Sequence, residues 1–213
     1  MEADPKRMDI LSKVAFAPVY PLIARQIKDK FGITEGICLD LGSGPASLSI
    51  ALAKITDLTI FALDISPEMS SIADANIAEE KLTHRIHTVV ANVHDTPFPG
   101  CCIDLIMSRG SIFFWEDRPS AFKEIYRILK YGGAAYCGGG FGSKEMKEEV
   151  ASRIKTEKEI LNSEREGWKW RVKNNLRKVT VEEFHAELIR ASVPGTVVRE
   201  NGGIWVEIKK GFG

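Results

Sequence analysis

The feature that most constrains the fold is a regular alternation of two kinds of segment between residues 37 and 138. Short apolar runs of strand length are each followed by a longer stretch whose apolar residues recur at helical spacing. This alternation is typical of successive βαβ units, which build a mostly parallel sheet. We expect strands at residues 37–41, 58–64, 85–91, 103–108 and 134–140. Helices are expected at residues 46–55 and 66–81 and within residues 119–133, where Gly132 stands just past the helix end.

The C-terminal residues predict an antiparallel ending for this sheet. Thr180 and Glu183 have the spacing of a capping box at the start of a helix over residues 179–192. Two β-rich runs within residues 196–210 are joined through residues 201–203, which is typical of a hairpin. Together with the strands above, the hairpin predicts a doubly wound, mostly parallel α/β sheet of about seven strands.

Two amphipathic regions lie outside the alternating core. The first, at residues 8–31, is interrupted by Pro18 and Pro21, so we expect helices that are broken near these prolines. The second, at residues 143–178, is long, charged and mostly helical in pattern. We expect both regions to form a helical cap over the carboxyl ends of the strands, within one domain that spans residues 1–213.

The composition argues against several classes of protein. Of the 213 residues, 29 are Lys or Arg and 29 are Asp or Glu, so no global field recruits nucleic acid or an anionic membrane. The N-terminal sequence lacks the apolar region of a signal peptide, and no apolar run approaches the roughly 20 residues of a membrane span. We therefore expect a cytoplasmic protein with neither membrane nor nucleic acid as a partner, and the sequence leaves its oligomeric state open.

The cysteines do not predict a metal site. Cys38, Cys101, Cys102 and Cys137 show no C-x-x-C spacing, so no structural zinc is expected. Cys38 and Cys137 fall in apolar runs, where a reduced cysteine acts as a small hydrophobic residue.

The turn in the stretch CLDLGSGPAS, residues 38–47, predicts close approach of a nucleotide to the backbone. Gly42 and Gly44 lie between an apolar run and a helix start. In a dinucleotide fold a third glycine would stand at Ser47, and Pro45 removes a backbone N–H that a phosphate would use. The loop is therefore poorly suited to a pyrophosphate, which disfavours a nicotinamide-dependent oxidoreductase.

Two carboxylates further indicate which nucleotide the loop would bind. Asp40 stands two residues before Gly42, where it would repel a phosphate and attract a cation. Asp64 ends the second expected strand, where a carboxylate suits hydrogen bonds to a ribose diol. S-adenosylmethionine, which carries an ammonium group and no phosphate, fits both.

Several motifs in order carry a family resemblance. The segments LDLGSGPAS, LDISPEM, ANVHDTPFP, IDLIMSRGSIFFWED and EIYRILKYGG follow one another as in class I S-adenosylmethionine-dependent methyltransferases of the small-molecule type, which the chain resembles over much of residues 15–140. The final helix and hairpin are similar to the antiparallel strand pair that closes the family's sheet. The resemblance implies a Rossmann-like methyltransferase fold, S-adenosyl-L-methionine as cofactor with S-adenosyl-L-homocysteine as product, and a small-molecule methyl acceptor.

The resemblance also implies where the cofactor would bind. The residues expected at its methionine end are Asp40, Gly42, Ser43 and Gly44. Those expected at the ribose and adenine are Asp64, Ile65, Met69, Asn92 and Val93. Ser108 and Arg109 end the fourth strand, where the backbone would face cofactor and substrate. Ala46 and Asn92 depart from the glycine and aspartate that are commoner there, so the contacts they make are expected to be weaker or differently oriented.

For several other residues the sequence predicts a role in the site less strongly. Tyr20 would reach the cofactor carboxylate if the N-terminal helices fold over it, and core packing is the alternative. His94 is a candidate general base, although a histidine in a surface loop is the default interpretation. The aromatic run Phe113, Phe114 and Trp115 could line a substrate pocket or the core. No side chain identifies itself as the catalytic base.

Residues 167–178 leave a second function class open. This basic stretch contains two tryptophans and no acid, which suits stacking on nucleic acid, a substrate lid or a solvated face. A methyltransferase that acts on RNA or protein, and a cofactor-binding protein without catalysis, remain the alternatives to a small-molecule enzyme.

Overall fold

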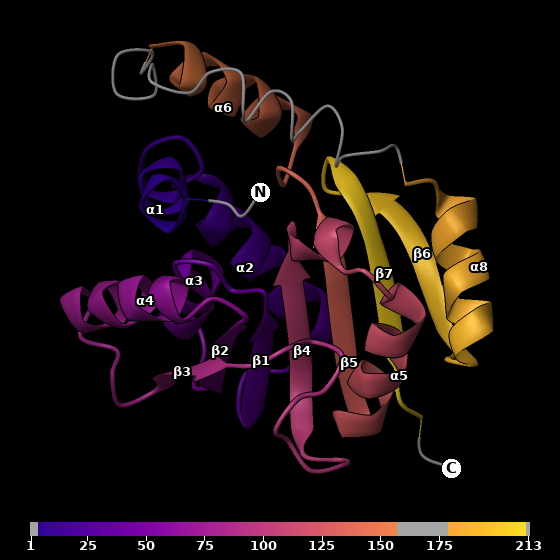
Figure 1. The fold of residues 1–213 in the computed structure, drawn as a ribbon. Coiled ribbons are helices and arrows are strands. Elements are labelled where there is room, and N and C mark those ends of the chain that lie inside the picture. The colour runs from indigo at the N-terminus through magenta and orange to yellow at the C-terminus, as the bar shows by residue number, and fades with distance from the viewer. Residues whose placement is uncertain (1–3, 157–178, 212–213) are drawn as a thin grey trace.

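The computed structural model describes residues 4–156 and 179–211. In this part of the chain seven strands form one sheet, in the order β3-β2-β1-β4-β5-β7-β6 (Figure 1). The strands are β1 (Ile37–Leu41), β2 (Thr59–Asp64), β3 (Ile86–Val90), β4 (Ile103–Arg109), β5 (Leu129–Gly139), β6 (Gly195–Glu200) and β7 (Gly203–Lys209). β1 to β5 pair with one another in parallel, and β7 runs antiparallel to both β5 and β6. The predicted doubly wound, mostly parallel sheet is confirmed.

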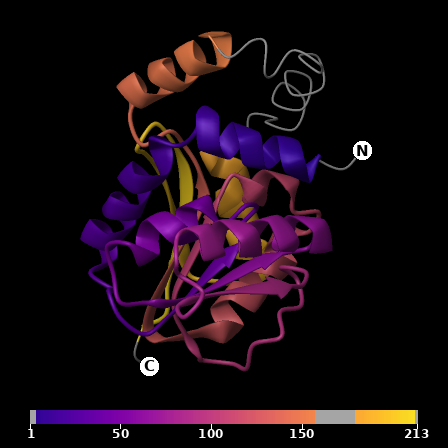
Figure 2. The ribbon, with the colours of Figure 1, turned by 90° about the vertical axis from the view of Figure 1, so that its left-hand side faces the viewer.

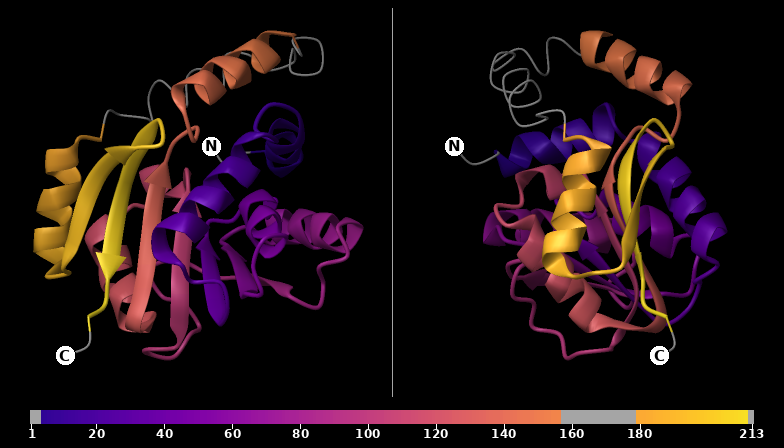
Figure 3. Two further views of the ribbon diagram at one scale, coloured as in Figure 1. Left: turned by 180° about the vertical axis from the view of Figure 1, so that it is seen from behind. Right: turned by 90° about the vertical axis from the view of Figure 1, so that its right-hand side faces the viewer.

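Helices cover both faces of the sheet. They are α1 (Pro5–Val14), α2 (Val19–Phe31), α3 (Ser47–Ala53), α4 (Pro67–Glu79), the short 3-10 helix η1 (Ser111–Phe114), α5 (Arg118–Ile128), α6 (Lys144–Thr156) and α8 (Val181–Ala191). One apolar core joins the sheet to α1–α4, of which α3 and α4 are nearest the viewer in Figure 2. The other core lies under α5 and α8, on the side seen in the right panel of Figure 3.

The predicted helix starts and the final turn are present. Ser66 accepts a hydrogen bond from the backbone N–H of Met69 at the start of α4, and Thr180 and Glu183 form the capping box of α8. Asn201 and Gly202, both with positive φ, make the two-residue turn between β6 and β7.

The boundary between α5 and β5 differs from the prediction. The helix ends at Ile128, and the chain is already extended at Leu129, which pairs with Ile103 of β4 and is fully buried. Gly132 therefore lies inside the strand, with a φ of 83°, where the pairing with β4 is irregular. Burial of Leu129 in the core outweighs the helical periodicity of the preceding residues.

The N-terminal helices break near the predicted prolines. α1 and α2 are separated at residues 15–18, and Pro21 lies in the first turn of α2, where its missing N–H removes no helical bond. Both α1 and α6 lie beyond the end of the sheet toward which β4 points (Figure 1). Val150 of α6 is 1% exposed, and Arg153 donates to the carbonyl oxygen of Val14 at 3.4 Å. The rest of the expected helical region, including the basic stretch at 167–178, lies outside the described residues.

In the described ranges, no helix combines the length and the apolar character needed to cross a membrane.

Candidate active site at the carboxyl edge of the sheet

The loop after β1 needs its glycines for two different reasons. Gly42 has a φ of 65°, and a Cβ there would lie 2.3 Å from the Cβ of Ser111, so only glycine fits. Gly44 has a φ of 56°, but a Cβ there would meet no atom within 4 Å. Ala46 takes the left-handed conformation, with a φ of 63°, at the position where a third glycine is commoner. The loop thus presents the backbone at Gly44 to open space.

Asp40 is the buried acid of the site. It lies near the end of β1, is 2% exposed, and accepts a hydrogen bond from Ser49 Oγ of α3 at 2.7 Å. The pKa of Asp40 is raised to about 7, chiefly because burial disfavours the charged carboxylate. The hydrogen bond from Ser49 lowers this pKa, whereas the negative charge of Asp64 raises it. Among the described residues no cation forms an ion pair with Asp40, so its charge is available to a cationic ligand.

Asp64, the last residue of β2, joins two loops. Its Oδ2 accepts from the backbone N–H of Gly44 at 3.0 Å, and its Oδ1 accepts from that of Ser66, also at 3.0 Å. Ser43 adds a backbone bond to the carbonyl oxygen of Leu63 at 3.0 Å. Each carboxylate oxygen of Asp64 keeps a second lone pair for a further donor. The hydroxyl of Ser66 caps α4, and Asp64 holds the glycine loop.

Ile65 and Met69 differ in their surroundings. Ile65 is 67% exposed, whereas Met69 in the first turn of α4 is buried. An apolar side chain exposed to that extent directly after Asp64 has room for a flat apolar ligand group to pack on it.

The loop after β3 brings Asn92 to the same edge. Its side-chain oxygen accepts from the backbone N–H of His94 at 3.0 Å and lies 2.6 Å from His94 Nδ1. His94 Nε2 accepts from the backbone N–H of Asp117 at 3.4 Å, so Nδ1 carries the proton that Asn92 accepts. Val93 is buried. Both ring nitrogens of His94 therefore have partners within the protein, which weakens its case as a general base.

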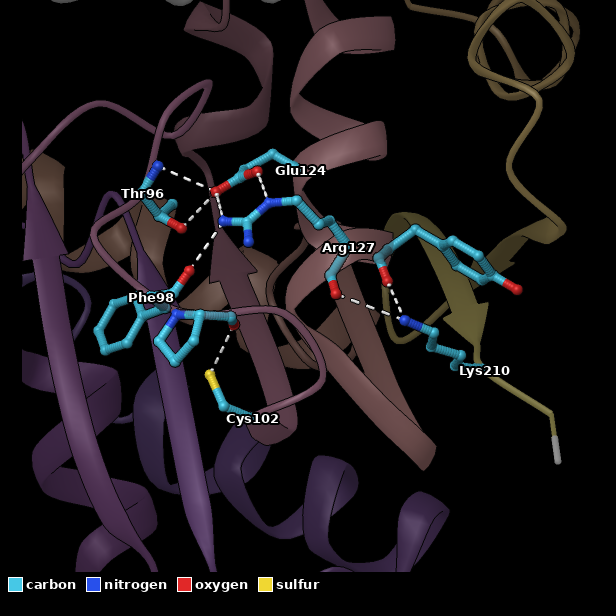
Figure 4. A network of polar contacts seen from close by, with 8 residues as sticks. Thr96, Phe98, Cys102, Glu124, Arg127 and Lys210 are labelled. Atoms are coloured by element: carbon cyan, nitrogen blue, oxygen red, sulfur yellow. Dashed lines mark hydrogen bonds and ion pairs between the residues drawn. The ribbon is translucent and has the colours of Figure 1, made fainter.

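A polar network fixes the rest of this loop to α5 (Figure 4). Glu124 accepts from the backbone and the hydroxyl of Thr96 and from two nitrogens of Arg127, which also donates to the carbonyl oxygen of Phe98 at 2.8 Å. Burial alone would raise the pKa of Glu124, but hydrogen bonds from Arg127 and Thr96 outweigh it and lower the pKa. The network also reaches Lys210, which donates to the carbonyl oxygens of Tyr126 and Arg127.

The end of β4 carries the last two predicted residues. Ser108 is buried, and its Oγ lies 2.6 Å from Ser111 Oγ, which donates to the carbonyl oxygen of Leu41 at 2.8 Å. This chain of hydroxyl groups fastens the loop after β4 to the end of β1, directly beneath Gly42.

Arg109 and Tyr20 lie together above the end of β4. The Arg109 guanidinium lies 5.3 Å from the centre of the Tyr20 ring and 4.9 Å from that of Phe16. Burial raises the pKa of Tyr20, the charge of Arg109 lowers it, and that of Asp40 raises it. The corner between α1 and α2 thus brings Phe16 and Tyr20 to the end of β4.

The aromatic run after β4 divides between core and surface. Trp115 is buried against Phe122, and Phe113 packs beside Phe184. Phe114 is 58% exposed, so it is the member of the run that is available to a ligand.

A groove of about 260 Å³ lies nearby, between α1, α2, α3 and α4. Of the predicted cofactor residues, Tyr20 is the one that lines it. The groove therefore lies among the helices α1–α4, and neither Asp40 nor Asp64 lines it.

Sequence reasoning missed three residues of this edge. Ser49 donates to Asp40, Ser111 closes the contact under Gly42, and Phe16 supports Arg109. Of these three residues, only Ser49 could have been identified from the sequence, because it lies on the helix that starts directly after the glycine loop.

Comparison with known proteins agrees with this geometry. The family model described as "Methyltransferase domain" matches residues 39–137. The crystal structure of a putative S-adenosyl-L-methionine-dependent methyltransferase from Methanococcus maripaludis is 42% identical and superposes with a TM-score of 0.88, covering 100% of this chain and 98% of that one. The chain belongs to the class I S-adenosylmethionine-dependent methyltransferases. Membership confirms the resemblance seen in the motifs and the family's cofactor, S-adenosylmethionine.

Curated relatives of this methyltransferase are more distant. A ubiquinone/menaquinone biosynthesis C-methyltransferase of Geotalea daltonii is 34% identical over 101 residues, which are 46% of this chain and 43% of that protein. An uncharacterized protein of Mycobacterium tuberculosis is 27% identical over 139 residues, 62% of this chain and 48% of that protein. The chain thus spans about half the length of these relatives.

Proposed function

We propose that this protein transfers a methyl group from S-adenosylmethionine to a nucleophilic atom of a small-molecule acceptor. One observation carries the proposal: Asp40 and Asp64 flank a glycine loop that is open at Gly44, without a phosphate-binding feature. The acceptor class is supported by the Geotalea daltonii relative, whose name assigns it to quinone biosynthesis as a C-methyltransferase.

The residues of the edge fit the cofactor. The free lone pairs of Asp64 suit the two ribose hydroxyls, and its bonds to Gly44 and Ser66 hold the carboxylate ready for them. The exposed Ile65 side chain offers a surface for the adenine. The Asn92 oxygen is engaged by His94, so its amide NH2 group is what remains to donate to a ring nitrogen of the adenine. The unpaired charge of Asp40 suits the ammonium group of the methionine moiety.

When bound, the cofactor supplies a methyl group that is already activated on a sulfonium. The protein residues then have to align the acceptor with that methyl group and keep water out. A base is required only where the acceptor atom carries a proton. We assign none, because both nitrogens of His94 are engaged by Asn92 and Asp117.

The cap belongs to this proposal as well. The corner between α1 and α2 contributes Phe16 and Tyr20 at the carboxyl edge, and α6 packs on α1. We propose that these helices roof the acceptor within a single domain over residues 1–213.

Two measurements test the function. Calorimetry should give measurable heat with S-adenosylmethionine and S-adenosylhomocysteine and none with NAD, and tighter binding of NAD would refute the proposal. Cofactor labelled in its methyl group is then incubated with separated small-molecule, RNA and protein fractions of a cell extract. Label in the small-molecule fraction supports the acceptor class; label only in RNA or protein, or no turnover at all, refutes it in favour of one of the two alternatives.

A further inference from the structure

Arg109 is a half-buried cation without an anionic partner in the described residues. Its Nε donates to the carbonyl oxygen of Gly140 at 3.1 Å, and the rings of Phe16 and Tyr20 pack on the guanidinium. In residues 4–156 and 179–211 no carboxylate pairs with it, and Tyr20 is the one titratable neighbour that affects its pKa, which burial lowers. The two terminal nitrogens of Arg109, with four N–H donors, therefore have no acceptor in this part of the chain.

Two other arginines of the fold give the contrast. Arg118 makes two hydrogen bonds of 2.7 Å to Glu187, and Arg127 makes two to Glu124. Removing a guanidinium from water is costly unless its donors are satisfied, and a planar pair of N–H groups matches a carboxylate or phosphate. The terminal N–H donors of Arg109 thus lack hydrogen-bond acceptors, and an acidic group of a ligand would supply them.

The position of Arg109 indicates which ligand that is. Along the carboxyl edge, β2 carries Asp64 and β1 carries Asp40, the residues proposed for ribose and ammonium. Arg109 ends β4, on the other side of β1, and its hydrogen bond to Gly140 holds it toward the end of β5. With adenosine over β2 and β3, the space above β4 and β5 is left to the acceptor.

We propose that Arg109 binds an acidic group of the methyl acceptor, a carboxylate or a phosphate, while Phe16 and Tyr20 hold its guanidinium in place. This inference rests on the proposed function. The other source of the same chemistry is the carboxylate of the cofactor, which Tyr20 was expected to reach, and the experiment has to separate the two.

The test uses the full chain saturated with S-adenosylhomocysteine. Fluorine NMR titrations compare para-fluorobenzoate with its neutral analogue para-fluorobenzamide, with inorganic phosphate as competitor. We expect the acid to bind about tenfold more tightly than the amide and phosphate to displace it, as one charge-assisted pair predicts. Arg109→Gln should abolish the preference and Arg109→Lys should restore part of it. Arg190→Gln, which changes an exposed arginine of α8, is the matched control and should retain it.

The outcomes are distinct. No preference in the wild type, no effect of phosphate, or a preference that survives in Arg109→Gln overturns the inference. So does a loss of S-adenosylhomocysteine affinity in Arg109→Gln with unchanged affinity for methylthioadenosine, which has no carboxylate, because Arg109 would then bind the cofactor. A wild type that does not bind S-adenosylhomocysteine refutes the proposed function itself, whereas normal cofactor binding without anion preference refutes only the acceptor inference.

Discussion

Asp40 should make both stability and cofactor binding depend on pH. Its pKa is raised from 3.8 to about 7, so the folded state binds a proton more tightly than the unfolded chain does. For such a group the free energy of unfolding is unaffected below the unfolded pKa and falls as pH rises toward the folded pKa. At about 1.36 kcal/mol per pKa unit, the fall between pH 4 and 7 amounts to about 4 kcal/mol.

Asp40→Asn isolates this contribution. The amide oxygen keeps the acceptor for Ser49 Oγ and cannot ionise. Urea unfolding from pH 5 to 8 should show the wild type losing stability relative to the variant, which should be the more stable protein at pH 8. If the two curves run parallel over this range, Asp40 does not titrate there and the burial argument is wrong.

The same variant tests the ligand side. If the ammonium group of the cofactor lies near Asp40, binding favours the ionised carboxylate, and S-adenosylhomocysteine should bind about tenfold more weakly at pH 6 than at pH 8. Calorimetry in buffers of different ionisation enthalpy should detect the released proton. Asp40→Asn should bind weakly with a flat pH profile; an unchanged profile would refute the placement of the ammonium group.

Three further changes follow from single contacts. Asp64→Asn should weaken S-adenosylhomocysteine binding by about 1–3 kcal/mol in calorimetry, because one of the two acceptor oxygens becomes a donor; unchanged affinity in a folded variant would make Asp64 purely structural. Gly42→Ala should lower the melting temperature more than Gly44→Ala, since both carry the left-handed penalty of about 1–2 kcal/mol but only the first clashes with Ser111; equal melting temperatures would contradict this packing. Glu124→Gln should cost about 1.5–3 kcal/mol in urea unfolding and leave cofactor affinity near that of the wild type, and a matched loss of both would mean that the network holds the site as well.

The fold was predictable wherever a local pattern decides it. Alternating strand and helix signals placed the parallel strands, and capping residues such as Ser66 and Thr180 placed helix starts. The α5 to β5 boundary was not predictable in this way. Leu129 fits the helical pattern of the residues before it, and only its pairing with Ile103, far earlier in the chain, makes it a strand residue.

In the candidate site, too, local sequence patterns identify some features and contacts between distant segments determine the others. The glycine loop and the two acids are close to one another in sequence or at strand ends, so motif spacing identifies them. The pKa of Asp40 depends on burial beneath α3, which no spacing reports. The environment of Arg109 depends on Phe16 and Gly140, which lie in distant segments of the chain.

The two halves of the site should respond differently to substitution. On the proposed cofactor side, Asp64 joins the glycine loop to the start of α4, and Ser111 joins the end of β1 to the loop after β4, so the sheet itself sets the geometry. On the proposed acceptor side, Phe16 and Tyr20 come from the corner between α1 and α2, which the sheet does not include. Because loops and helices outside the sheet tolerate change better than strand ends do, acceptor choice can diverge among relatives through this corner while cofactor binding is retained.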